Sequence, residues 1–110
     1  KQQLASGLSC VSKMQIGDVV VAYEPVWAIG AKEAMSSHQV HEMSLYIQKC
    51  IKEMYGAMVP MPKILYGGAV NADNAREIVD HGHVDGLLVG RESLKVENFV
   101  GIIMNVDLIK

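Results

Sequence analysis

The chain has 110 residues, and its 10 lysines and arginines against 12 aspartates and glutamates leave a formal net charge of −2. Half of its residues are hydrophobic, which is typical of a globular unit. A charge so close to zero gives no electrostatic reason to bind nucleic acid or an anionic membrane, so we expect neither as a partner. No apolar run approaches the roughly 20 residues that span a bilayer, and the first residues lack the apolar core of a signal peptide, which favours a cytoplasmic location.

Three elements are expected in the first half of the chain. Leu4, Leu8 and Val11 recur at helical spacing and predict a helix that begins at the first residues. The β-branched run over 18–24 predicts a strand that is buried on both faces, as in a parallel sheet. A long helix with an apolar face is predicted from Ser36 or Ser37, either of which is a suitable N-cap, to Gly56.

The second half repeats the alternation of strand and helix. A second strand is expected over 63–66, ending at two glycines, and a third over 84–90. A short helix over 74–81, closed by Gly82, lies between them, and a final helix carries Phe99, Ile102, Ile103 and Val106. This order predicts an α/β fold with a parallel sheet.

Cysteines, histidines and methionines suggest no metal site or cofactor. Cys10 and Cys50 have no CxxC spacing and are expected to be small core residues. The four histidines form two pairs in sequence that no carboxylate or thiol cluster completes, so we expect solvated or capping side chains and no metal; the pairs are His38 with His41 and His81 with His83. Methionines on helix faces, such as Met43 and Met54, are expected to fill gaps in the core.

Each predicted strand ends in a polar or glycine-rich segment. In parallel α/β folds the carboxyl ends of the strands meet at one edge, so we expect these exits to converge on one pocket. The carboxylate of Glu24 after the first strand is open to two interpretations: a general base whose pKa is raised by partial burial, or a structural anchor. The glycines near Gly67 and Gly90 suit either backbone contacts to an anion or ordinary turns.

Three segments together resemble the triosephosphate isomerase family: 22–30 (AYEPVWAIG), 66–71 (YGGAVN) and 84–90 (VDGLLVG). The resemblance implies the last three βα units of a (β/α)8 barrel, preceded by the end of its fifth helix, with parallel strands and outer helices. Residues 1–110 would then be the C-terminal portion of one incomplete barrel domain, with no internal domain boundary. The family needs no cofactor.

The resemblance also implies roles for individual residues. Glu24 would be the catalytic base that moves a proton between two carbons of an enediolate intermediate, in a family that is a well-studied case of this chemistry. A mobile lid would close over the substrate phosphate and exclude water, and the hydroxyl of Tyr66 would hold the closed lid. Backbone amides would bind the phosphate at Gly30, Ala69, Gly90 and Arg91. The lid and its hinge would comprise Pro25, Val26, Trp27, Ala31, Lys32 and Glu33.

Several positions depart from the family pattern. Lys32 and Glu33 stand at the lid tip where the family has glycine and then lysine, and Ala69 stands where it has serine. We expect the closed lid to be less stable by about the net value of one hydrogen bond, about 1 kcal/mol. Arg91 replaces a second glycine, and its guanidinium offers an added charge contact to the phosphate. Asp85 lacks the arginine that pairs with it in the family, so we expect it to be solvated or differently paired.

The resemblance predicts interconversion of dihydroxyacetone phosphate and glyceraldehyde 3-phosphate. The electrophilic groups of the family are an asparagine and a lysine on the first strand and a histidine on the fourth, so the 110 residues alone are expected to be inactive without those strands. The full-length family forms homodimers, and this chain is expected to self-associate or to pair with a complementary chain. Two alternatives stay open: a related isomerase of longer ketose phosphates, and a non-catalytic half-barrel module that self-associates.

Overall fold

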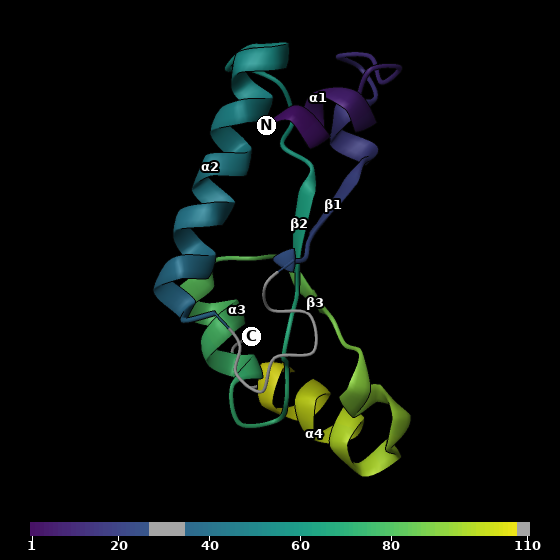
Figure 1. The fold of residues 1–110 in the computed structure, drawn as a ribbon, viewed down its shortest axis with the longest axis vertical. Coiled ribbons are helices and arrows are strands. Elements are labelled where there is room, and N and C mark those ends of the chain that lie inside the picture. Colours follow the sequence, from purple (N-terminus) through teal and green to yellow (C-terminus); the bar gives the residue numbers. More distant parts are fainter. Residues whose placement is uncertain (27–34, 108–110) are drawn as a thin grey trace.

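The computed structural model describes residues 1–26 and 35–107. Within these residues, β1 (Val20–Tyr23), β2 (Lys63–Gly67) and β3 (Gly86–Leu88) form one parallel sheet with β2 in the middle (Figure 1). The sequence-based prediction of an α/β fold with parallel strands and outer helices is confirmed. The remaining described elements are α1 (Gln2–Gly7), η1 (Ile16–Asp18), α2 (Ser37–Tyr55), α3 (Ala75–Gly82), η3 (Arg91–Leu94) and α4 (Val96–Asp107).

The strands are parallel because a helix returns the chain to the same end of the sheet each time. Helix α2 connects β1 to β2, and α3 connects β2 to β3. The register pairs Val20 with Lys63 and Tyr23 with Tyr66 across the first interface, and Gly67 with Leu88 across the second. The carboxyl ends of the three strands therefore lie side by side.

Helix α2 is the longest element, and its boundaries match the prediction. Ser36 is its N-cap: the Ser36 hydroxyl accepts from the amide of Gln39, and the Gln39 side chain accepts from the amide of Ser36. This reciprocal capping box satisfies two amides that an open helix start would leave unpaired. Gly56, with φ of +99°, ends the helix where a side chain would be strained.

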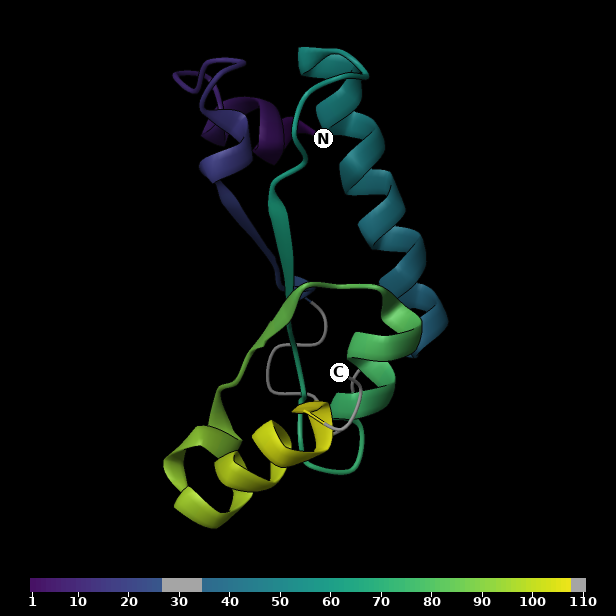
Figure 2. The same cartoon turned by 180° about the vertical axis from the view of Figure 1, so that it is seen from behind.

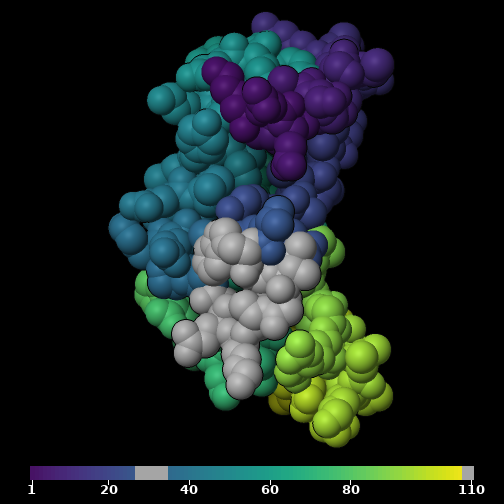
Figure 3. Space-filling model, viewed as in Figure 1, coloured from purple at the N-terminus to yellow at the C-terminus, as the bar shows by residue number. Residues whose placement is uncertain are grey.

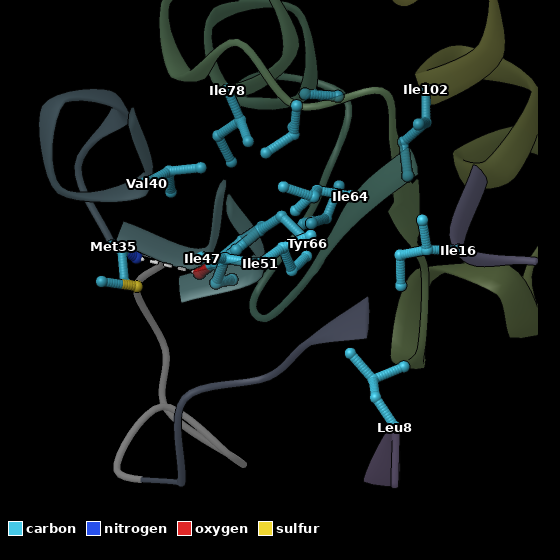
Figure 4. Close-up of a cluster of buried hydrophobic side chains, with 13 residues drawn as sticks. Leu8, Ile16, Met35, Val40, Ile47, Ile51, Ile64, Tyr66, Ile78 and Ile102 are labelled. Carbon is cyan, nitrogen blue, oxygen red and sulfur yellow. Dashed lines mark hydrogen bonds between the residues drawn. The ribbon is translucent and has the colours of Figure 1, made fainter. Parts of the chain in front are cut away.

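The core lies between the sheet and helices α2 and α3. Ile64 and Tyr66 of β2 pack against Ile47 and Ile51 of α2 (Figure 4). The predicted core positions Met43 and Met54 are partly buried and pack against this cluster, whereas Cys50 is buried outright. Figures 1 and 2 show α2 running along one side of β2, and α3 lies beside the N-terminal end of α2.

The opposite face of the sheet is open, so the prediction that the first strand is buried on both faces is wrong. Along β1 the residues alternate between exposed and half-buried, and Val20 is 55% exposed. Leu88 of β3 is 46% exposed. The apolar composition of β1 is typical of a strand that is covered on both faces of its sheet. The described helices cover only one of these faces.

Several predicted boundaries shift. Helix α1 ends at Gly7, before Leu8 and Val11, and the first strand begins only at Val20 because a 3-10 turn occupies Ile16–Asp18. The third strand is shorter than predicted, at Gly86–Leu88. The expectation that Cys10 is a core residue is also wrong, because it follows the end of α1 on the surface. Figure 3 shows these first residues at one end of the molecule and α4 with η3 at the other.

Helix α3 ends differently from the prediction. Gly82 is its last residue, and the C-cap is His83, which adopts the left-handed conformation with φ of 52°. Gly82 serves a close approach instead: a Cβ at that position would lie 2.9 Å from Cγ1 of Val40 in α2. The glycine is therefore placed by helix packing, and the histidine takes the capping role that was expected for some of the histidines.

Asp85 is differently paired, as expected. Its carboxylate Oδ2 accepts a hydrogen bond of 2.8 Å from the amide of Ile64, and its own amide donates to the Ile64 carbonyl at 2.8 Å. The pair of bonds extends the ladder between β2 and the segment before β3. A backbone amide thus takes the place of the arginine that the resemblance pairs with this residue.

We expect Asp85→Ala to lower the free energy of unfolding by about 1.5 kcal/mol, because the Ile64 amide loses a charged acceptor. Asp85→Asn keeps an oxygen acceptor of the same shape and is expected to lose less than half as much. Urea denaturation of the two variants checks this. Equal losses in both variants would show that the charge, and not the acceptor geometry, is what the fold requires.

Candidate active site

The carboxyl ends of the strands bring Glu24 beside a glycine and an apolar residue. Glu24 follows β1, and the register places it level with Gly67 and Leu88. A Cβ added to Gly67 would lie 3.7 Å from Cβ of Glu24 and 3.5 Å from Cβ of Leu88, so the three positions form a row on the open face. The ends of the three strands thus lie side by side in the backbone arrangement.

Glu24 itself is exposed, so the partial burial that the general-base interpretation invoked is absent in this structure. The reason is its place on the open face of the sheet, which the described helices do not cover. Pro25, directly after it, is buried, whereas Val26 is 79% exposed. Glu24 therefore directly follows a paired strand, and its side chain is open to solvent.

The loop after β2 is ordered by two asparagines. Oδ1 of Asn71 accepts from the amides of Asp73 and Asn74, and Oδ1 of Asn74 accepts from the amide of Asn71. The Asn74 amide group donates to the carbonyl of Ala69 at 2.8 Å. These bonds hold the backbone at Ala69, a predicted phosphate-binding position, in one conformation, and sequence patterns gave no signal for this network beyond the turn preference of asparagine.

The loop after β3 turns sharply at Gly90. The amide and the hydroxyl of Ser93 both donate to the Gly90 carbonyl, which starts the 3-10 turn η3. Arg91, the first residue of that turn, is exposed. The two predicted phosphate contacts at Gly90 and Arg91 therefore lie at the exit of the strand next to β2.

Tyr66 ties the end of β2 to the start of α2. Its ring is 1% exposed, and its hydroxyl accepts a hydrogen bond of 3.1 Å from the amide of Met35 (Figure 4). Burial raises the pKa of this hydroxyl, and the hydrogen bond from Met35 partly opposes the rise. The bond holds the backbone at Met35, shortly after the lid positions Ala31, Lys32 and Glu33 that the resemblance implies.

Gly68 is the second of the two glycines at the end of β2, for which the sequence left open an anion contact or an ordinary turn. A Cβ there would overlap the Tyr66 hydroxyl and lie 2.9 Å from its ring carbon Cε2. The Tyr66 ring thus lies directly over the Gly68 backbone. Glycine is required here by the packing of the tyrosine and not by the turn itself.

Five of the predicted site residues lie outside the described residues: Trp27, Gly30, Ala31, Lys32 and Glu33. Within 1–26 and 35–107, no group of three or more His, Cys, Asp and Glu side chains is arranged to hold a metal ion. A groove of about 580 Å³ lies beside β3 and is lined largely by apolar residues of β3 and α4, Leu88 among them, but not by Glu24. No helix in the same described ranges is both long and apolar enough to cross a lipid bilayer.

Comparison with known proteins identifies the family. The family model described as triosephosphate isomerase matches residues 1–106. The chain belongs to the triosephosphate isomerase family. It is 43% identical over 104 residues to the triosephosphate isomerase of Alkaliphilus oremlandii and 40% identical over 104 residues to that of Flavobacterium psychrophilum, covering 94% of this chain and 42% of each relative. The relative from Idiomarina loihiensis is 42% identical over 101 residues, with 92% and 40% covered.

Family membership accounts for the open sheet. The chain spans about 42% of the length of the relatives first compared. Its three parallel strands with outer helices are part of a (β/α)8 barrel, in which a strand has a neighbour on both sides and its inner face is filled by the other strands. The exposed face of β1 and β3 is the face that points into such a barrel.

Proposed function

We propose that the chain supplies the base and the phosphate-binding loops of a triosephosphate isomerase, which interconverts dihydroxyacetone phosphate and glyceraldehyde 3-phosphate in the cytoplasm. The observation that carries the proposal is the row of Glu24, Gly67 and Leu88 at the carboxyl ends of three parallel strands. An exposed carboxylate on a rigid strand end suits proton abstraction beside a carbonyl, because the substrate carbon reaches it without displacing protein.

The loops after the two strands that follow Glu24, β2 and β3, support the phosphate part of the proposal. The amides near Ala69 and Gly90 belong to two adjacent strand exits, and both loops are held by internal hydrogen bonds. Preformed amides of this kind stabilise an anion at little cost of ordering. Arg91 adds a positive charge at the second exit, where the family has glycine.

The electrophilic groups of the family, by the resemblance above, come from its first and fourth strands, whereas the described sheet consists of β1, β2 and β3. Charge that develops on the enediolate needs hydrogen-bond donors, and much of the rate in such reactions comes from them. We therefore infer that Glu24 turns over substrate only when those strands are supplied, and that the family homodimer forms through the same completed barrel.

The experiment is complementation. The 110-residue chain is assayed with dihydroxyacetone phosphate alone, and again after covalent fusion to the remaining N-terminal residues of the Alkaliphilus oremlandii relative. We expect no turnover above buffer in the first case and turnover in the second. A folded fusion that turns over no triose phosphate would contradict the proposal.

The same fusion separates the alternatives. A tetrose phosphate turned over faster than the triose would favour an isomerase of longer ketose phosphates. The self-associating module has one observation in its favour, the exposed apolar residues Val20 and Leu88 on the open face. That alternative requires an isolated chain with a mass above 12.0 kDa by light scattering, together with an inactive fusion.

A further inference from the structure

The fold brings together two histidines that are far apart in the sequence. His41 lies in the second turn of α2, and His83 is the C-cap of α3. Their ring centroids are 4.6 Å apart, and the ring planes are inclined by 48°. The sequence pairs considered above were His38 with His41 and His81 with His83; the tertiary structure instead joins one member of each pair.

The geometry points to a divalent transition-metal site: we propose that His41 and His83 together bind one ion of the kind that takes imidazole ligands at right angles, such as Ni²⁺ or Cu²⁺. A metal bound about 2.1 Å from a ring nitrogen lies about 3.2 Å from the ring centre. Two such rings at right angles around one ion have centres about 4.5 Å apart, which matches the observed separation. Inclined planes also suit adjacent ligands better than a parallel stack does.

The two helices hold the histidines in place. Gly82 allows the end of α3 to approach Val40 of α2, where a Cβ would lie 2.9 Å from Cγ1. The hydroxyl of Ser37 donates to the Glu77 carboxylate at 3.3 Å, which links the same two helices again. A pair of ligands on two rigid, directly packed elements loses little freedom when an ion binds.

His83 also adopts a backbone conformation that favours glycine or asparagine. Its φ of 52° is the one positive value of a non-glycine residue within 1–26 and 35–107. A left-handed residue other than glycine costs free energy, yet here it directs an imidazole toward α2. Solvent reaches the pair, because His41 is half-buried and His83 is exposed, so water can fill the other coordination positions.

The neighbouring histidines are arranged differently, which makes them suitable controls. His38 is exposed and pairs with Glu42 on its own helix, at 3.0 Å between Nε2 and Oε1. His81 is exposed in the last turn of α3. Neither has a second imidazole in contact among the described residues.

Calorimetric titration with Ni²⁺ tests the proposal. We expect one ion per chain, and binding at least about tenfold weaker in His41→Gln and in His83→Asn, because each removes one of two protein ligands. Asparagine is chosen at position 83 because it tolerates the left-handed conformation. His38→Gln and His81→Gln are expected to bind like the unsubstituted chain. Equal weakening in all four variants, or no binding in the unsubstituted chain, would overturn the proposal.

A second measurement needs no substitution and decides the matter if a variant fails to fold. Ni²⁺ is paramagnetic and broadens the nuclear magnetic resonance signals of nearby protons. At substoichiometric Ni²⁺ we expect the ring signals of His41 and His83 to broaden together, before those of His38 and His81. Uniform broadening of the signals of all four histidine rings would mean that Ni²⁺ binds the surface histidines without preference, which would overturn the proposal.

Discussion

Replacing Glu24 with glutamine is expected to lower turnover of dihydroxyacetone phosphate by about 10³-fold in the fused, complete barrel. Glutamine keeps the shape of the side chain but accepts no proton, and a positioned general base contributes roughly 10² to 10⁴ in rate. Glu24 is exposed and lies in a row with Gly67 and Leu88, so the substitution disturbs no packed contact. A coupled assay measures kcat and KM, and we expect the loss in kcat.

The matched control is Glu97→Gln, which removes another exposed carboxylate, in the first turn of α4. It changes the net charge by the same amount at a place that the proposal does not use. We expect its kcat to stay within about twofold of the unsubstituted fusion. Loss of activity in both variants, or in neither, would show that Glu24 is not the base.

Gly68→Ala is expected to lower the free energy of unfolding by about 3 kcal/mol. The added Cβ would overlap the hydroxyl of Tyr66, whose side chain is buried in the core. A displaced ring also breaks the hydrogen bond from the Met35 amide. Urea denaturation measures the loss of stability, and hydrogen exchange at the Met35 amide, which we expect to become faster, reports on the bond itself.

Gly7→Ala is the control for the glycine substitution. Nothing lies within 4 Å of a Cβ at Gly7, the last residue of α1, and its φ is not in the left-handed region. Alanine is the better helix former, so we expect a gain of up to about 1 kcal/mol. A similar, small effect at both glycines would mean that the Tyr66 ring has room to shift, and that Gly68 is only a turn residue.

The glycines of this chain show where the local sequence pattern is sufficient to predict a residue's role and where it is not. The start of α2 at Ser36 and its end at Gly56 were predictable, because capping depends on residues within one turn of the helix end. From the local sequence alone, Gly82 and Gly68 are equally compatible with residues that simply end a helix or a strand. Their actual neighbours, Val40 and Tyr66, are brought to them by helix packing and by the folded loop after β2.

The candidate site divides in the same way. Glu24 and the glycines after the strands were predictable, since parallel strands place their carboxyl ends together and the motifs resemble a known family. The exposure of Glu24 was not predictable from its apolar strand, because burial depends on what covers the sheet, and only one face is covered within the described residues. The family resemblance, and not composition, is the source of the roles proposed for Ala69, Gly90 and Arg91.

By itself the sequence determined the alternation of strands and helices, the parallel sheet and the place of the candidate base, because periodicity, capping and strand-end motifs are properties of neighbouring residues. Only the tertiary structure decided that Asp85 pairs with the Ile64 amide, that Tyr66 holds the Met35 amide, and that His41 meets His83. These three contacts join residues 21 to 42 positions apart. The pairing of β2 with the segment before β3 makes the first contact, and the packing of α2 against the sheet and against α3 makes the other two, so periodicity over neighbouring residues carries no signal for them.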